Sequence, residues 1–144
     1  MKKTALYIKG LKVRYGAIEA LKGIDMEVME GDVVAILGAN GAGKTTTLRT
    51  ISGLIEPAEG SILFYNKEIG KLEPNKIAQM GIAQSPEGRQ VFRDLTVEEN
   101  LKVGAFTVKD KKKVVESFER VYRYFPVLKE RKNQIGRASC RERV

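Results

Sequence analysis

The sequence predicts an α/β fold in which an antiparallel β layer leads into a parallel sheet. Two stretches of alternating apolar and polar residues, Ala5 to Tyr15 and Ala20 to Val28, are typical of half-buried strands, and the first is expected to bend near Gly10. The continuous aliphatic run from Val33 to Leu37 is typical of a strand buried on both faces. A glycine-rich turn and a helix-forming stretch, Lys44 to Ser52, follow this run. A strand, a glycine turn and a helix in this order indicate the start of an α/β sheet.

The glycine-rich turn matches the phosphate-binding pattern G-x-x-x-x-G-K-[S/T] at each fixed position. Its sequence is Gly38-Ala39-Asn40-Gly41-Ala42-Gly43-Lys44-Thr45. Glycines let successive N–H groups point at phosphate oxygens, and the positive end of the helix dipole adds to the attraction. We expect Lys44 to contact the β- and γ-phosphates and the Thr45 hydroxyl to coordinate Mg²⁺. Nucleotide binding is therefore favoured over a glycine turn that ends in Lys-Thr by chance.

Turn residues place the elements that follow. The segment 56–60 is a predicted turn, and Ser61 to Tyr65 a predicted strand. Pro74 is a favourable first helical residue and Gly81 a favourable residue after a helix end, so we expect a helix over 74–80. Beyond it we expect a short strand at Ile82-Ala83 and a loop over 85–89.

Two helices are predicted in the last third of the chain. Thr96 and Glu99 have capping-box spacing, so a helix is expected to begin at Val97. A second helix is expected from Lys111 to Phe125, with Pro126 ending it. One broad face of this helix is apolar, and we expect it to pack in a core rather than bind a ligand: Val114, Val115, Phe118, Val121, Tyr122 and Phe125.

Composition excludes several classes of site. The chain has 144 residues, one cysteine (Cys140) and no histidine, which excludes an internal disulfide, a His-based triad and a metal cluster. The net charge is +8, and half of this excess lies in residues 129–144, without interleaved aromatic residues. A solvated surface is therefore expected rather than a nucleic-acid groove. The apolar runs are too short to cross a bilayer or to form a signal core, so a soluble, cytosolic chain is expected.

Tyr15 lies 23 residues before Gly38, at the end of the first predicted strand. An aromatic ring at this position can stack on an adenine base. A tyrosine packed within the strand is an equally good interpretation from this residue alone.

Four stretches occur in a fixed order along the chain: Tyr15-Gly16, G-A-N-G-A-G-K-T-T at 38–46, S-P-E-G-R at 85–89 and L-T-V-E-E-N-L at 95–101. Together they resemble the first half of an ABC-type ATPase domain. More narrowly, they resemble the ATP-binding subunits of bacterial and archaeal branched-chain amino acid importers. The resemblance covers residues 4–136 and implies a truncated P-loop NTPase core, with an antiparallel β layer and the start of a helical subdomain.

The resemblance also implies roles for individual residues. Tyr15 would stack on adenine and Thr46 would contact the α-phosphate. Glu87 takes the place of the glutamine that senses Mg²⁺ and the attacking water in most ABC ATPases, with which Gln84 does not align. Residues 85–101 would connect to a helical subdomain that docks on the membrane subunit, with Phe92 near that contact. The implied ATP-binding set is Tyr15, Gly38, Asn40, Gly41, Ala42, Gly43, Lys44, Thr45 and Thr46, and Thr45 and Glu87 would serve Mg²⁺.

The implied partners are ATP, transmembrane permease subunits and a second ATPase subunit in a dimer, but no nucleic acid. The protein would lie on the cytoplasmic face of the membrane, held there by the permease. The sequence lacks the family's signature loop, its catalytic carboxylate pair and its switch histidine. We therefore expect a chain that binds ATP but is incomplete for hydrolysis. Residues 137–144 are expected to be foreign to the domain, through truncation or a frameshift, with a genuine variant terminus as the alternative.

Two other classes of function remain open at this point. One is a P-loop NTPase of another class, such as a kinase or a GTPase. A GTPase normally has N-K-x-D, and Asn75-Lys76-Ile77-Ala78 lacks the aspartate. The other is a non-catalytic nucleotide- or nucleic-acid-binding module. Any generic DNA binding would be recognised by its collapse with salt.

Overall fold

The computed structural model describes residues 2–88 and 90–136, which fall into two compact units, one ending at Gln84 and one beginning at Ser85. The expected foreign tail, 137–144, lies outside the described residues, as does Arg89 of the predicted loop. Within the described ranges, none of the helices has both the length and the apolar character needed to cross a bilayer.

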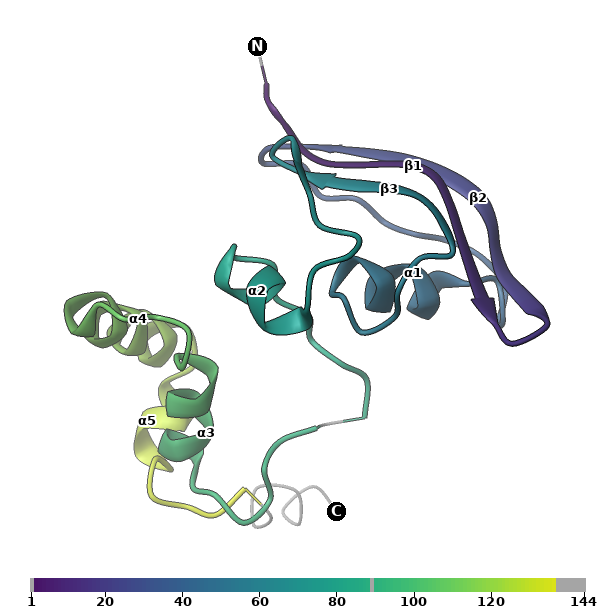
Figure 1. Cartoon of the computed structure of the whole chain (residues 1–144). Coiled ribbons are helices and arrows are strands. Elements are labelled where there is room, and N and C mark those ends of the chain that lie inside the picture. The colour runs from purple at the N-terminus through teal and green to yellow at the C-terminus, as the bar shows by residue number, and fades with distance from the viewer. Residues whose placement is uncertain (1, 89, 137–144) are drawn as a thin grey trace. The chain divides into compact units, whose positions relative to one another are not determined.

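The first unit contains a four-stranded sheet in the order β2-β1-β3-β4, antiparallel throughout (Figure 1). Its strands are β1 (Thr4–Tyr15), β2 (Ile18–Met29), β3 (Glu59–Phe64) and β4 (Lys67–Glu68). The predicted antiparallel layer is therefore confirmed, and β1 lies between β2 and β3.

A β-bulge in β1 occurs where the sequence predicts a bend. Ile8 pairs with Met26 and Leu11 with Ile24, so β1 uses one residue more than β2 over this step. Gly10 lies within the bulge with φ of 57°, and its N–H donates to the Asp25 carboxylate at 2.6 Å. The extra residue changes the parity of the strand, so that Ile8 and Leu11 both face the core.

The core lies between the sheet and two helices, α1 (Lys44–Ile51) and α2 (Pro74–Gln79), on one side of it (Figure 1). Both helices begin and end within a residue or two of their predicted limits, and Pro74 is the first residue of α2. Each supplies one buried isoleucine to a cluster that is otherwise built from the sheet and the loops. Its buried members are Ile8, Leu11, Val13, Leu21, Ile51, Ile62, Ile69 and Ile77.

The predictions of two further strands are wrong. Residues 32–39 contain no strand, and Val33 and Leu37 are 99% and 89% exposed. Ile82-Ala83 is also without regular structure. A strand buried on both faces requires hydrogen-bonded neighbours and covering layers, because its backbone groups must be paired. The described residues form no parallel strand beside 33–37, so an aliphatic run alone does not create one there.

The described residues of the second unit form three helices: α3 (Val97–Gly104), α4 (Lys111–Tyr124) and α5 (Pro126–Glu130). The first two agree with the predicted helices. Pro126 follows the end of α4 as predicted, but it also begins α5, which the sequence analysis did not include. The apolar face of α4 is only partly covered: Phe118 and Tyr122 make an edge-to-face contact at 6.0 Å, whereas Val115 and Phe125 are exposed. The expected core packing of this face is therefore only partial.

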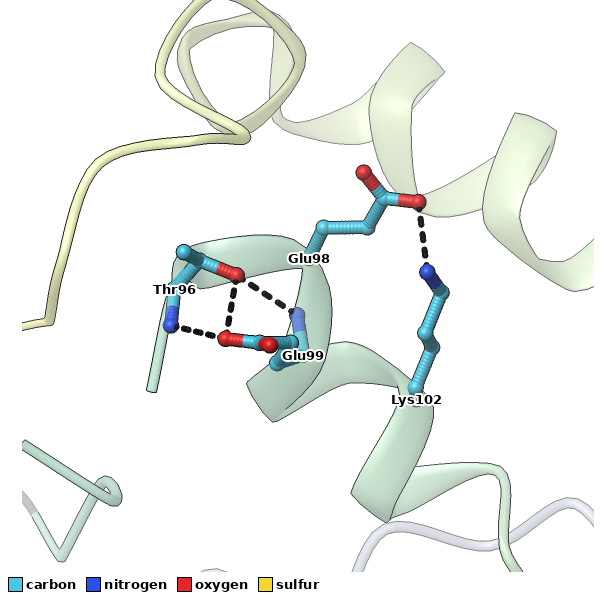
Figure 2. A network of polar contacts seen from close by, with 4 residues as sticks. All are labelled: Thr96, Glu98, Glu99 and Lys102. Atoms are coloured by element: carbon cyan, nitrogen blue, oxygen red, sulfur yellow. Dashed lines mark hydrogen bonds and ion pairs between the residues drawn. The ribbon is translucent and has the colours of Figure 1, made fainter. Parts of the chain in front are cut away.

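The predicted capping box at the start of α3 is confirmed (Figure 2). The Glu99 N–H donates to the Thr96 hydroxyl oxygen, and the Thr96 N–H and hydroxyl both donate to Glu99 Oε2 at 2.8 Å. These donors, the backbone N–H first, hold the pKa of Glu99 below its ordinary value of 4.5. An ion pair between Glu98 and Lys102 at 3.0 Å, one turn apart, adds a small contribution on the exposed side.

We expect Thr96→Ala to destabilise the second unit by about 1 kcal/mol at neutral pH, as loss of a helix cap does. Because the pKa of Glu99 is lowered on folding, its contribution is complete above pH 4.5 and declines as the pH falls below that value. Thermal unfolding at pH 7 and pH 3 measures the effect. The difference between the wild-type and Thr96→Ala proteins should narrow at pH 3, and an equal difference at both pH values would contradict the role of the ionised Glu99.

Candidate functional site

The predicted phosphate-binding loop, residues 38–46 (the P-loop), leads directly into α1. Gly43 is the N-cap residue with φ of 87°, and the Ala42 N–H donates to the Ala39 carbonyl at 3.1 Å. Helical geometry leaves the N–H groups of residues 44–46 without an acceptor inside the helix. With the positive end of the helix dipole, these groups favour an anion at the start of α1.

Gly43 allows the P-loop to lie directly against β2. A Cβ atom at this position would be 2.5 Å from Leu21 Cδ2 and 3.1 Å from the Ala20 carbonyl oxygen. Its φ also lies in the left-handed region, which side chains other than hydrogen disfavour. Leu21 is buried in the core, so this contact fixes the loop relative to the sheet.

Two backbone carbonyls hold the Lys44 ammonium over the P-loop. Lys44 Nζ donates to the carbonyl oxygens of Gly38 and Ala39, both at 2.7 Å. An ammonium group has three donors, so within the described part of the chain one remains for a phosphate oxygen. The half-buried Lys44 thus places a positive charge beside the N–H groups of the first helical turn.

Tyr15 lies next to the P-loop although it is distant in sequence. It ends β1, its side chain is 47% exposed, and its hydroxyl oxygen is 3.5 Å from Thr46 Oγ1. Thr45 is exposed at the start of α1. The structure therefore brings the predicted adenine, phosphate and Mg²⁺ residues of the first unit into one region. The other predicted contacts lie in the same loop: Gly38, Asn40, Gly41, Ala42 and Gly43.

Mg²⁺ fits this region only together with phosphate. Among residues 2–88 and 90–136, no group of three or more His, Cys, Asp or Glu side chains is arranged to hold a metal ion. Mg²⁺ usually keeps several waters and is bound by substrate phosphates with one or two protein ligands. The Thr45 hydroxyl beside a phosphate cradle meets that requirement.

Glu87 and Phe92 belong to the second unit, so the structure gives their positions only within that unit. The Glu87 side chain is exposed in the irregular segment before α3, and Phe92 is 58% exposed. The part of Glu87 in the site therefore rests on the sequence alone.

Sequence reasoning missed two side chains that fix the chain on either side of Glu87. Gln84 accepts a hydrogen bond from Ser52, and Asn100 is bonded to the backbone of Phe92. Asn100 lies in the stretch 95–101, for which the sequence predicts a capped helix start and a family motif but no role for this side chain. A polar residue in a helix is common, so Asn100 carries little signal in the sequence for this contact.

The chain matches the family model described as ABC transporter over residues 21–140. It is 46% identical over 121 residues to the high-affinity branched-chain amino acid transport ATP-binding protein BraG of Pseudomonas aeruginosa, an alignment covering 83% of this chain and 51% of that protein. It is 36% identical over 119 residues to the probable branched-chain amino acid transport ATP-binding protein LivF of Archaeoglobus fulgidus, covering 83% and 50%.

Comparison with solved structures leads to the same family as the sequence comparisons. The ATP-binding subunit of an ABC transporter superposes with a TM-score of 0.80 at 30% identity, covering 91% of this chain and 54% of the other. A nucleotide-free ATP-binding cassette from an ABC transporter superposes with a TM-score of 0.75 at 27% identity, covering 93% and 58%. The chain spans about half the length of the curated relatives that it matches.

Proposed function

Because this chain belongs to the ABC transporter family, we propose that it forms the nucleotide-binding half of an importer ATPase subunit, with branched-chain amino acids as the transported substrate. The observation that carries the proposal is the P-loop geometry. Lys44 Nζ, bonded to the Gly38 and Ala39 carbonyls, lies beside the N–H groups that begin α1. This arrangement is a cradle for the phosphates of ATP.

Each residue of the site has a stated task in this proposal. Lys44 neutralises the β- and γ-phosphates, Thr45 provides a ligand to Mg²⁺ and Thr46 contacts the α-phosphate. The Tyr15 ring stacks on adenine. Mg²⁺ bound there would neutralise phosphate charge, and Glu87 would accept a hydrogen bond from a water beside it.

We place residues 4–136 in one partial ABC domain and assign the residues after 136 no part in the site. The proposed partners are the transmembrane permease subunits, contacted near the exposed Phe92, and a second ATPase subunit. The names of the importer relatives support the substrate. The protein would then be cytoplasmic and peripheral to the membrane.

Calorimetric titration with Mg-ATP tests the proposal, and Tyr15 supplies a variant specific to the base. Tyr15→Ala should weaken ATP binding by about 1–3 kcal/mol, the contribution of a stacked base, and leave tripolyphosphate binding nearly unchanged. Tyr15→Phe is the control, because it keeps the ring and removes only the hydroxyl contact with Thr46. Equal weakening of both ligands by Tyr15→Ala would show that Tyr15 supports the fold rather than the base.

A further inference from the structure

We propose that Ile18 is a second base-contacting residue, and that with Tyr15 it forms an apolar wall for a purine ring. The inference rests on the proposed function, in which the ATP phosphates lie in the P-loop and the base lies on Tyr15. It adds to that site a further residue and a preferred size of base. All the residues that carry it belong to the first unit.

A tight hairpin places Ile18 directly opposite Tyr15 (Figure 1). Tyr15 ends β1, Ile18 begins β2, and the two are partners in the antiparallel register. Only Gly16 and Ala17 lie between them, and Gly16 has φ of 59°. The turns favoured in two-residue hairpins have a positive φ at the first central position, which glycine adopts without strain. The turn therefore fixes the pairing of the two side chains.

Tyr15 and Ile18 lie on the face of the sheet that faces the P-loop helix. Directly opposed residues of an antiparallel pair share a face. The preceding pair, Arg14 and Glu19, lies on the other face, because successive residues of a strand alternate, and it forms an ion pair at 3.6 Å. The Tyr15 hydroxyl oxygen is 3.5 Å from Thr46 Oγ1 in α1. Ile18 therefore lies on the same side of the sheet as α1.

The strand that carries Ile18 also contacts the P-loop. Gly43 lies so close to β2 that a Cβ atom on it would be 2.5 Å from Leu21 Cδ2 and 3.1 Å from the Ala20 carbonyl oxygen. A chain extends at most about 3.6 Å per residue, so the Ile18 Cα lies within about 11 Å of the Leu21 Cα. Ile18 is thus next to Tyr15 and close to the phosphate-binding loop.

The Ile18 side chain is uncovered, although the next core pair along the hairpin is buried. Ile18 is 71% exposed and Tyr15 is also exposed, whereas Val13 and Leu21 belong to the core. A single exposed isoleucine is common on protein surfaces and needs no explanation. An isoleucine beside an exposed aromatic ring, close to an anion site, offers a nucleotide the apolar contact that ligand sites combine with a few polar groups.

The apolar wall is longer than the tyrosine ring alone. Directly opposed side chains have Cβ atoms about 4.5–5.5 Å apart. A two-ring purine stacked on Tyr15 is long enough to reach Ile18, whereas a one-ring pyrimidine is covered by the tyrosine ring. Ile18 has no polar side-chain atom, so it contributes burial of apolar surface and does not distinguish adenine from guanine.

Calorimetric titration of the whole chain with Mg-ATP, Mg-GTP, Mg-CTP and tripolyphosphate tests the inference. Ile18→Ala should weaken ATP and GTP binding by about tenfold, the scale of a partly buried aliphatic side chain, and CTP binding by less than about threefold. Tripolyphosphate binding should be nearly unchanged. Ile18→Val should keep most of the affinity, because it keeps most of the apolar surface. Leu54→Ala, at another exposed apolar residue beyond the far end of α1, is the matched control and should change none of the four affinities.

Two further measurements report contact rather than structural support. In the Tyr15→Ala protein, Ile18→Ala should weaken ATP binding little further, because a base that is not held on the ring no longer meets the wall. A nuclear Overhauser effect should join the Ile18 methyl groups to the H2 or H8 proton of bound adenine, with Ile18→Val identifying the signal. Absence of this effect in the ATP complex would overturn the contact.

The outcomes separate this inference from the proposed function. No binding of Mg-ATP to the wild-type chain overturns the proposed function, and the role of Ile18 with it. ATP binding that Tyr15→Ala weakens and Ile18→Ala does not weaken overturns the inference alone. An equal loss of ATP and CTP affinity in Ile18→Ala also overturns it, because no second ring is then contacted. An equal loss of ATP and tripolyphosphate affinity does so too, because the hairpin then only supports the P-loop.

Discussion

Replacement of Lys44 by alanine is expected to weaken Mg-ATP binding by roughly 100-fold, because it removes one charge-assisted hydrogen bond to a phosphate oxygen and the positive charge beside the phosphates. The ammonium is positioned before any ligand arrives, because the carbonyls of Gly38 and Ala39 hold it at 2.7 Å. Little ordering of a long side chain is then needed on binding, so most of the interaction energy goes into affinity. Isothermal titration calorimetry of the two proteins measures the difference.

The matched control for this experiment is Arg49→Ala. Arg49 is an exposed basic residue in the last turn of α1, so its loss removes the same charge from the same helix, away from the P-loop. Its effect on affinity should be small and should disappear at higher salt. Thermal unfolding of both variants checks that α1 remains formed. Equal affinities of the wild-type and Lys44→Ala proteins would exclude the P-loop as the nucleotide site.

Features set by neighbouring residues in the sequence were predicted well. The P-loop, the capping box of Thr96 and Glu99 and the proline start of α2 each depend on a few adjacent side chains and the local backbone. The bend at Gly10 was also predicted, because a glycine between two alternating runs favours a bulge. The proximity of Tyr15 to Thr46 follows from the family motif order rather than from either residue.

Features set by distant partners were not predicted. The run Val33 to Leu37 has the composition of a buried strand, but a strand forms only against another strand, and composition does not supply the neighbour. The hydrogen bonds of Gln84 with Ser52 and of Asn100 with Phe92 join residues that are 32 and 8 positions apart in the chain. Amide side chains are common on protein surfaces, so Gln84 and Asn100 carry little signal in the sequence for such contacts.

Gly60→Ala is expected to cause the largest loss of stability in the first unit, about 3 kcal/mol or more. Gly60 lies in β3 with φ of 94°, opposite the bulge of β1. A Cβ atom there would be 2.5 Å from the Gly10 carbonyl oxygen and 2.7 Å from the Lys9 carbonyl oxygen. These are backbone atoms, so no side-chain rotation relieves the contact and the two strands must separate. Ile8 and Ile62, which pair across this junction and are fully buried, would lose packing as a result.

The Gly31→Ala variant, measured in the same way, separates the cost of a steric clash from the cost of placing alanine in a left-handed backbone conformation. Gly31 has φ of 81°, but a Cβ atom there would meet nothing within 4 Å, so only the conformational cost of about 1–2 kcal/mol applies. Urea unfolding should therefore show Gly60→Ala as clearly the less stable protein of the two. The bulge that a Cβ atom at position 60 would displace lies in β1, the strand that ends at Tyr15. ATP binding should therefore also weaken in Gly60→Ala but not in Gly31→Ala. An equal loss of stability in both variants would mean that the left-handed backbone alone, and not the approach of β3 to the bulge of β1, requires glycine at position 60.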